Sequence, residues 1–266
     1  MHRRSPEPLN PLPPRTGAHA CQAFTLIEML VVIAIIGILA TIGLPAIKGM
    51  TKSNATIAAN RQLLDDFTYA RQRAIADHTS VYVVFDPPTI LNFTPTKLTS
   101  QASAMHTYTN LLGGQYTTYA LLSLRSVGDQ PGQTSPHYLT AWRSLPQGIF
   151  IAASKFSGTT NAVNFYTNAF RYAQFPFPTI DTNSTLTTFL LPYVGFDYQG
   201  QLISQVDEAI PLSRGSILYP RDADGNFISS APDVLETPPG NSITTSNVIH
   251  IDWLTGRAHI ERQEVQ

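Results

Sequence analysis

Two places in the chain combine side chains that could bind a metal ion. The run Asp222-Ala-Asp-Gly-Asn226 places three oxygen-bearing side chains within five residues, as in a fragment of a calcium loop. It lacks the glycine position and the distal Glu of that loop, so we predict an Asp-Gly turn instead. His250 and His259 could face each other across a C-terminal hairpin, but two His do not complete a zinc site. We therefore expect no metal and no cofactor.

Nucleophilic chemistry is equally poorly supported. The chain has one cysteine, Cys21, which excludes an internal disulfide and a multi-cysteine zinc site. It contains no G-x-S-x-G, P-loop or H-E-x-x-H sequence. A membrane-anchored hydrolase, the enzyme alternative, would need a triad or metal cluster that the sequence does not suggest. We expect no catalytic residues and no enzymatic activity.

The carboxylate with the least ordinary surroundings is Glu28, at the start of a long aliphatic run. From Met29 to Ile47 no residue is charged, which gives 19 positions, close to the ~20 that a helix needs to cross a bilayer. A secretory signal peptide would have a shorter apolar region and a cleavage site after it, whereas Lys48-Gly-Met-Thr-Lys52 follows here. A carboxylate inside such a segment usually has a partner and a function.

Ala23, then Phe24-Thr-Leu-Ile-Glu28 and the aliphatic run, resembles the N-terminal signature of type IV prepilins and type II secretion pseudopilins. The resemblance implies a leader peptide of residues 1–23, cut between Ala23 and Phe24 by a prepilin peptidase that then methylates the Phe24 amine. Glu28 becomes the fifth residue of the mature chain. There it would pair with the amine of a neighbouring subunit and set the register of assembly. The residue before the cut is usually Gly, so Ala23 departs from the pattern.

The same resemblance implies the partners and the location. The partners are the prepilin peptidase, other pilin or pseudopilin subunits, the inner-membrane assembly platform and the lipid bilayer. Residues 24–50 would be a transmembrane and assembly helix, kinked by Pro45, which removes one backbone hydrogen bond. The C-terminal domain would lie in the periplasm. Charge does not support this orientation, because Lys48 and Lys52 adjoin the far end of the apolar run.

Beyond the apolar run, the pattern is typical of an α+β, pilin-like globular domain over residues 51–266. Residues 51–76 form an amphipathic helix continuous with the first. Its predicted buried face comprises Ile57, Leu64, Phe67, Ala70 and Ala74. Residues 77–266 read as a mostly antiparallel β-sheet. Strands are expected at 81–85, 117–124, 149–152, 162–166, 186–191, 201–204, 216–219, 248–251 and 257–261. Turns are expected at Tyr198–Gln201 and Leu254–Gly256, and long loops at 87–116 and 221–247.

Three further segments resemble H-type minor pseudopilins and FimT-like minor pilins: Leu64–Ile75, Gly195–Gly200 and Ile249–Arg257. A weaker similarity is to verrucomicrobial cassette prepilin-like proteins. The alternative function is that of a DNA-binding minor pilin, in which Arg257 would contact phosphate. Residues 77–266 carry nine basic and fourteen acidic groups, and this acidic balance does not favour nucleic acid as a partner. We expect a structural subunit, a minor component of a type IV pilus or a type II secretion pseudopilus.

Overall fold

The computed structural model describes residues 25–88, 108–126, 128–130, 135–157, 169–176, 188–228, 230–244 and 247–262. In the first helix the description omits the side chains of Ala40 and residues 42–53. The chain divides into two units, Met1–Gly49 and Met50–Gln266, and each is described by itself.

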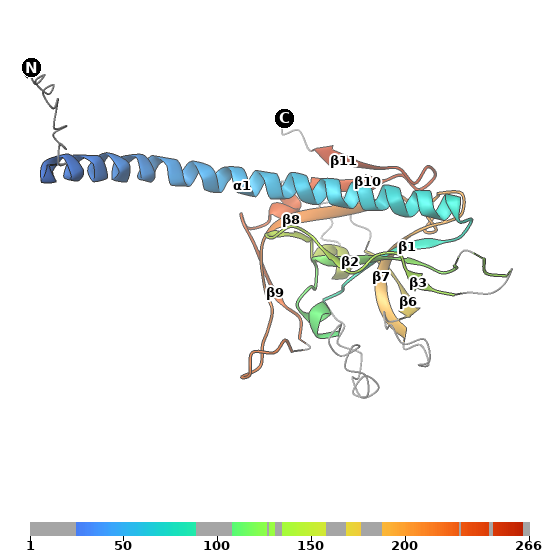
Figure 1. Ribbon diagram of the computed structural model, residues 1–266. Helices are drawn as coiled ribbons and strands as arrows, with labels where there is room; N and C mark the ends of the chain where they lie inside the picture. Colours follow the sequence, from blue (N-terminus) through green and yellow to red (C-terminus); the bar gives the residue numbers. More distant parts are fainter. Residues whose placement is uncertain are drawn as a thin grey trace, which may run out of the picture. The chain divides into compact units, whose positions relative to one another are not determined.

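One helix, α1 (Leu26–Ala76), contains both the apolar run and the amphipathic segment (Figure 1). This confirms the predicted continuous helix, with its start two residues after Phe24. At its C-terminal end, His78 adopts a positive φ of 48° and the Thr79 amide donates to the Ala74 carbonyl at 3.1 Å, which closes the last turn. Pro45 lies within the bounds of α1, and the predicted kink there stays a prediction.

Two antiparallel sheets follow. In the first, the order is β3-β2-β1-β7-β6, with β4 paired to β2. Its strands are β1 (Val81–Phe85), β2 (Thr118–Ser123), β3 (His137–Tyr138), β4 (Arg143–Ser144), β6 (Arg171–Pro176) and β7 (Thr188–Phe196). In the second, the order is β11-β10-β8-β5, with β9 paired to β8. Its elements are β5 (Ile149–Ile151), β8 (Glu208–Leu218), β9 (Asp233–Glu236), β10 (Asn247–Ile251) and β11 (Ala258–Arg262). The described residues also include two short helices, α3 (Ser154–Ser157) and α4 (Asn241–Thr244), and a helical turn at 108–112.

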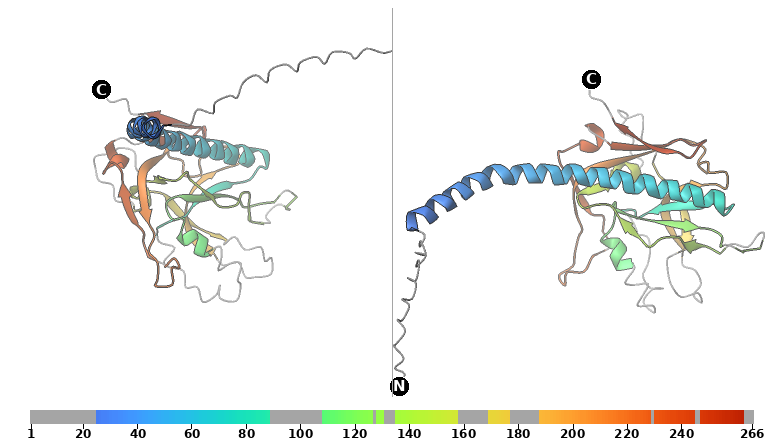
Figure 2. Two further views of the ribbon diagram at one scale, coloured as in Figure 1. Left: turned by 60° about the vertical axis from the view of Figure 1, so that its left-hand side comes forward. Right: turned by 45° about the horizontal axis from the view of Figure 1, so that its top comes forward.

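The C-terminal half of α1 packs on both sheets, as the two views of Figure 2 show. The buried helix residues share one face and are at most 1% exposed: Ala59, Leu63, Phe67, Ala70 and Ala74. They join apolar side chains of β1, β2, β5, β7, β8 and β10 in one core. The α+β prediction is confirmed, but the predicted face was partly wrong. Ile57 is 41% exposed, because it precedes Ala59 by two residues and so points to the opposite side of a 3.6-residue helix.

The far face of the first sheet is also covered. A second apolar cluster includes Val84 of β1, Leu122 of β2 and Leu191 of β7. Tyr108, Leu111 and Leu112 lie against it from a helical turn at 108–112. The central strands β1 and β2 are therefore covered on both faces, which explains why they read as near-continuous apolar runs.

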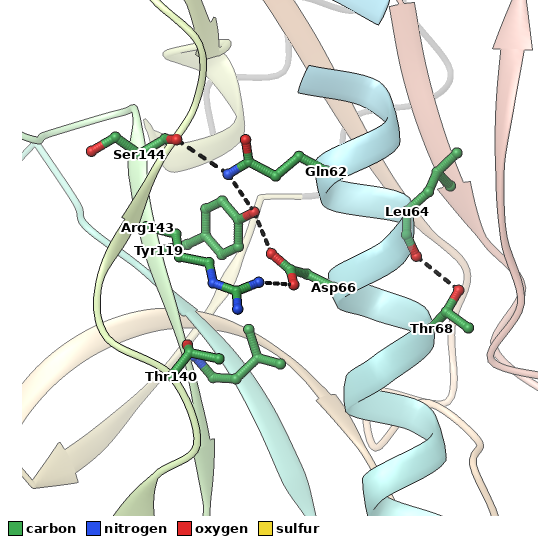
Figure 3. Close-up of polar contacts among 9 residues, drawn as sticks. Gln62, Leu64, Asp66, Thr68, Tyr119, Thr140, Arg143 and Ser144 are labelled. Atoms are coloured by element: carbon green, nitrogen blue, oxygen red, sulfur yellow. Dashed lines mark hydrogen bonds and ion pairs between the residues drawn. The ribbon is translucent and has the colours of Figure 1, made fainter. Parts of the chain in front are cut away.

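A polar network joins α1 to the first sheet (Figure 3). The Tyr119 hydroxyl donates to Asp66 Oδ2 at 2.6 Å, and Gln62 Nε2 donates to the Tyr119 oxygen at 2.9 Å. Arg143 of β4 pairs with the other carboxylate oxygen of Asp66, which is 5% exposed. Burial raises the pKa of the Tyr119 hydroxyl, so it remains a hydrogen-bond donor at physiological pH.

Of the nine expected strands, five are confirmed, two (186–191 and 216–219) overlap β7 and β8 only in part, and one is wrong. Strands β1, β2, β5, β10 and β11 match within one residue at each end, and segment 162–166 lies outside the described residues. The expected strand at 201–204 is a turn with a single bridge from Leu202 to Phe196. The expected loop 221–247 contains β9 and α4, because pairing with β8 orders a segment that has little hydrophobic periodicity. Strands β3, β4 and β6 were not predicted.

Candidate functional site

The N-terminal part of α1 exposes its apolar side chains on every side. Within residues 25–41 every described side chain is exposed, and Leu26 reaches 86%. The exposed large apolar residues are Leu26, Ile27, Met29, Leu30, Val31, Val32, Ile33, Ile35, Ile36, Ile38 and Leu39. A helix that is apolar all round requires an apolar environment that this unit does not itself supply among its described residues.

Glu28 lies in the first turn of this helix. Thr25 caps the helix, because the Glu28 amide donates to Thr25 Oγ1 at 3.3 Å and to the Thr25 carbonyl at 3.1 Å. A carboxylate three residues after a Thr cap lies near the positive end of the helix dipole, which stabilises its charge by about 0.3–1 kcal/mol. Glu28 is exposed and so is accessible to a cation from another molecule. Ala23 and Phe24, the predicted cleavage and methylation residues, lie outside the described residues.

A search of the described residues for membrane spans finds no helix that is both long and apolar enough to cross a bilayer. The apolar run extends to Ile47, and the side chains of residues 42–47 lie outside the description.

In the second unit, residues of three segments singled out from the sequence contact one another. The segments are Leu64–Ile75, Gly195–Gly200 and Ile249–Arg257. Arg71 Nε donates to the Thr255 carbonyl at 2.7 Å, which fastens α1 to the turn between β10 and β11. Gly256, with φ of +61°, sits so close to Gly200 that an added Cβ would overlap the Gly200 carbonyl oxygen. A Cβ at Gly200, with φ of +80°, would lie 2.7 Å from Ile75 Cδ1. Two turns and the end of α1 therefore pack through positions that only glycine fits.

The C-terminal hairpin brings His250 and His259 together as predicted. They are directly opposite in the register of β10 and β11, with ring centroids 5.7 Å apart. His250 Nε2 lies 2.6 Å from Glu261 Oε2. Arg257 is exposed, and its carbonyl accepts a hydrogen bond from the Asp252 amide across the turn at 3.1 Å. Acidic side chains thus accompany Arg257 on this hairpin, an unfavourable setting for phosphate.

The Asp222 segment is a turn, as predicted. Asp222 Oδ1 accepts hydrogen bonds from the amides of Asn226 at 2.8 Å and Asp224 at 3.0 Å. These bonds, chiefly the one from the Asn226 amide, lower the pKa of the Asp222 carboxyl. The carboxylate oxygens that a cation would need are engaged by the turn itself. Across the described ranges, no group of three or more His, Cys, Asp or Glu could hold a metal ion.

No sequence pattern indicated the buried ionisable groups. Lys155 of α3 and Glu208 of β8 form an ion pair with 2.7 Å between Nζ and Oε2, and their side chains are 0% and 3% exposed. Burial lowers the pKa of Lys155, while Glu208 opposes that shift. Asp86, directly after β1, is fully buried, and among the described residues its two carboxylate oxygens have no hydrogen-bond partner. The burial of these groups depends on contacts between residues that are far apart in the sequence, and hydrophobic periodicity does not reveal such contacts.

Comparison with known protein families matches residues 19–44 to the prokaryotic N-terminal methylation motif. No curated protein sequence and no solved structure matches the chain. The chain carries the N-terminal methylation motif of type IV prepilins and pseudopilins. The motif implies processing by a prepilin peptidase, anchoring of the N-terminal segment in the inner membrane and assembly with other pilins, which are structural proteins.

Proposed function

We propose that this protein is a minor structural subunit of a type IV pilus or a type II secretion pseudopilus. In this proposal residues 1–23 are the leader, the cut falls between Ala23 and Phe24, and the new Phe24 amine is methylated. The observation that carries the proposal is the all-round exposure of apolar side chains from Leu26 to Leu39 within the matched motif. Such a helix is suited first to a lipid bilayer and then to a bundle of the same helices.

The charge in this segment supplies the specificity of assembly. A carboxylate at full depth in a bilayer costs about 2.5–3.5 kcal/mol, and a charged amine there costs a similar amount. Pairing Glu28 with the Phe24 amine of an adjacent subunit neutralises both charges. A subunit displaced along the helix axis would leave both unpaired, so the pair fixes the axial register.

The second unit, Met50–Gln266, contains the predicted globular domain of residues 51–266, which we place in the periplasm before assembly. It is attached through α1, whose C-terminal half belongs to its core. Assembly of the N-terminal helices would therefore position each globular domain on the outside of the filament. The kink expected at Pro45 lies between these two parts of α1.

The H-type, or FimT-like, subtype is supported by the meeting of Arg71, Gly200 and Gly256. These residues come from the three sequence segments that resemble that subtype, and they contact one another in the fold. A DNA-binding role is not proposed, since the hairpin that bears Arg257 also carries Asp252 and Glu261.

The test of the proposed function is Glu28→Gln, with Glu28→Asp as the matched control that retains the charge. Removing one partner of a buried pair costs about 3–5 kcal/mol, so incorporation of the Gln variant into filaments should fall by at least about 100-fold. The amounts in the membrane and in sheared filaments are measured by immunoblotting. We expect normal membrane levels of both variants and substantial recovery of incorporation with Asp. Wild-type incorporation of Glu28→Gln would refute the pairing.

A further inference from the structure

Beside the start of the second unit lies a pocket that the proposed function does not use. It has a volume of about 180 Å³ and lies between Ala55 of α1, the turn before β5 and the strand β8. This volume corresponds to roughly six water molecules. The pocket is therefore large enough for a small ligand group and too small for most drug-sized molecules.

Among the described side chains that line this pocket, the charge is positive and the other polar groups are neutral. Arg214 is the single ionisable residue among the described residues that line it, and the others with polar side chains are Gln147, Ser216 and Thr237. Within the described part of the chain, the Arg214 guanidinium has no hydrogen bond or ion pair. The nearby carboxylate of Glu236 is already engaged, by the Ser213 hydroxyl at 3.2 Å and the Ser242 amide at 3.1 Å.

The backbone that carries Arg214 is held firmly. Asn241, which is 2% exposed, accepts from the Arg214 amide at 2.9 Å and donates to its carbonyl at 2.7 Å. Gly215 follows directly, and an added Cβ there would overlap the Leu235 carbonyl oxygen. Gly148, with φ of +83°, accepts a hydrogen bond from the Gly215 amide at 3.0 Å. These contacts hold the backbone on both sides of the pocket in place, so the position of Arg214 is set before any ligand arrives.

We propose that this pocket binds the phosphate group of a phospholipid. A guanidinium with hydroxyl and amide donors around it matches the oxygens of a phosphate, because each can donate a charge-assisted or neutral hydrogen bond. The choice of a lipid as the source of the phosphate rests on the membrane anchoring in the proposed function. The match between the pocket and a phosphate group does not depend on that function.

Position along the chain favours the lipid source. Ala55 follows Ile47, the end of the uncharged run, by eight residues, which span at most about 28 Å however the chain is arranged. Lys48 and Lys52 fall between them and would be attracted to the same anionic surface. Leu235 of β9 is paired with the lining residue Ser216, and Leu218 follows Ser216 on β8; both are 59% exposed and offer apolar surface to the acyl chains.

The experiment titrates the full chain, in a phosphate-free non-ionic detergent, with glycerol 3-phosphate and separately with short-chain phosphatidylglycerol, by calorimetry. We expect both to bind, the lipid at least about tenfold more tightly because it adds apolar contacts. Arg214→Gln should weaken both by at least about tenfold. Arg61→Gln, which removes the same charge from an exposed position on α1, should leave both unchanged.

A second variant guards against a folding defect in Arg214→Gln. Ser216→Asp places a negative charge in the pocket at an exposed position and should weaken binding to a similar extent while the unfolding midpoint stays that of the wild type. Equal affinities for the two ligands would overturn the lipid assignment and leave a soluble phosphate site. Absence of binding, or binding unaffected by both pocket variants, would overturn the pocket itself. Neither result bears on filament assembly, which the Glu28 variants test separately.

Discussion

The two halves of α1 differ in what covers their apolar side chains. From Leu26 to Leu39 the large apolar residues are exposed, and Leu26 reaches 86%. From Ala59 to Ala74 one apolar face is at most 1% exposed, because two sheets of the same chain pack on it. Among the described residues, the chain therefore covers only one half of the helix. In the proposed assembly, lipid and then other subunits cover the other half, and the exposed apolar residues are the physical basis of that proposal.

The largest expected effect contrasts one apolar residue from each half. Phe67 is 1% exposed and its ring centroid lies 6.4 Å from that of Phe196, so Phe67→Ala should lower the free energy of unfolding by about 3–5 kcal/mol. Ile33 is 65% exposed, so Ile33→Ala should leave unfolding of the second unit unchanged. Denaturant unfolding of the full chain in detergent, followed by tryptophan fluorescence, measures both. Equal effects of the two substitutions would contradict the contrast between the halves.

A smaller effect is expected where two turns hold the sheets against the end of α1. Gly256→Ala adds a Cβ that would overlap the Gly200 carbonyl, at a positive φ, and should cost about 2–3 kcal/mol of unfolding free energy. Gly225→Ala is the matched control, because Gly225 also has a positive φ, of +84°, but open space around it. It should cost only about 1 kcal/mol. If the two variants unfold at the same denaturant concentration, the close approach of the turns contributes nothing.

The smallest effect concerns Asp86, which is buried in the sheet that covers α1. Burial raises the pKa of this carboxyl well above its usual value, so the folded chain retains a proton that the unfolded chain releases. This contribution to stability is greatest below the unfolded pKa and decreases as pH rises toward the folded pKa. Asp86→Asn should therefore raise the unfolding temperature at pH 8 more than at pH 4. Asp65→Asn, at an exposed position, should show no such difference. A pH-independent effect of Asp86→Asn would contradict the raised pKa.

The sequence allowed α1, the α+β class and the strands with strong β-propensity to be predicted, since local periodicity determines them. It misassigned Ile57 to the buried face, because an isolated apolar residue resembles a core residue until the packing is known. It did not indicate β6 or β9, because these segments form strands through pairing with β7 and β8. Loop 87–116 was only partly testable, since residues 108–112 form a helical turn and 89–107 lie outside the description.

For the candidate sites, the methylation motif was predicted because its residues are contiguous. The pocket at Arg214 was not, since its lining comes from α1, β5, β8 and the segment after β9, and no local pattern joins them. The same reason explains why the ion pair of Lys155 with Glu208 was missed. Tertiary contacts between distant segments are what single-sequence patterns lack.

The most direct test of the central claim is mass spectrometry of the N-terminal peptide of the protein from cells that contain an active prepilin peptidase. The account predicts a chain that begins at Phe24 and carries one methyl group on its α-amino nitrogen. Recovery of residues 1–23 still attached, or of a chain that begins after Ile47, would contradict it.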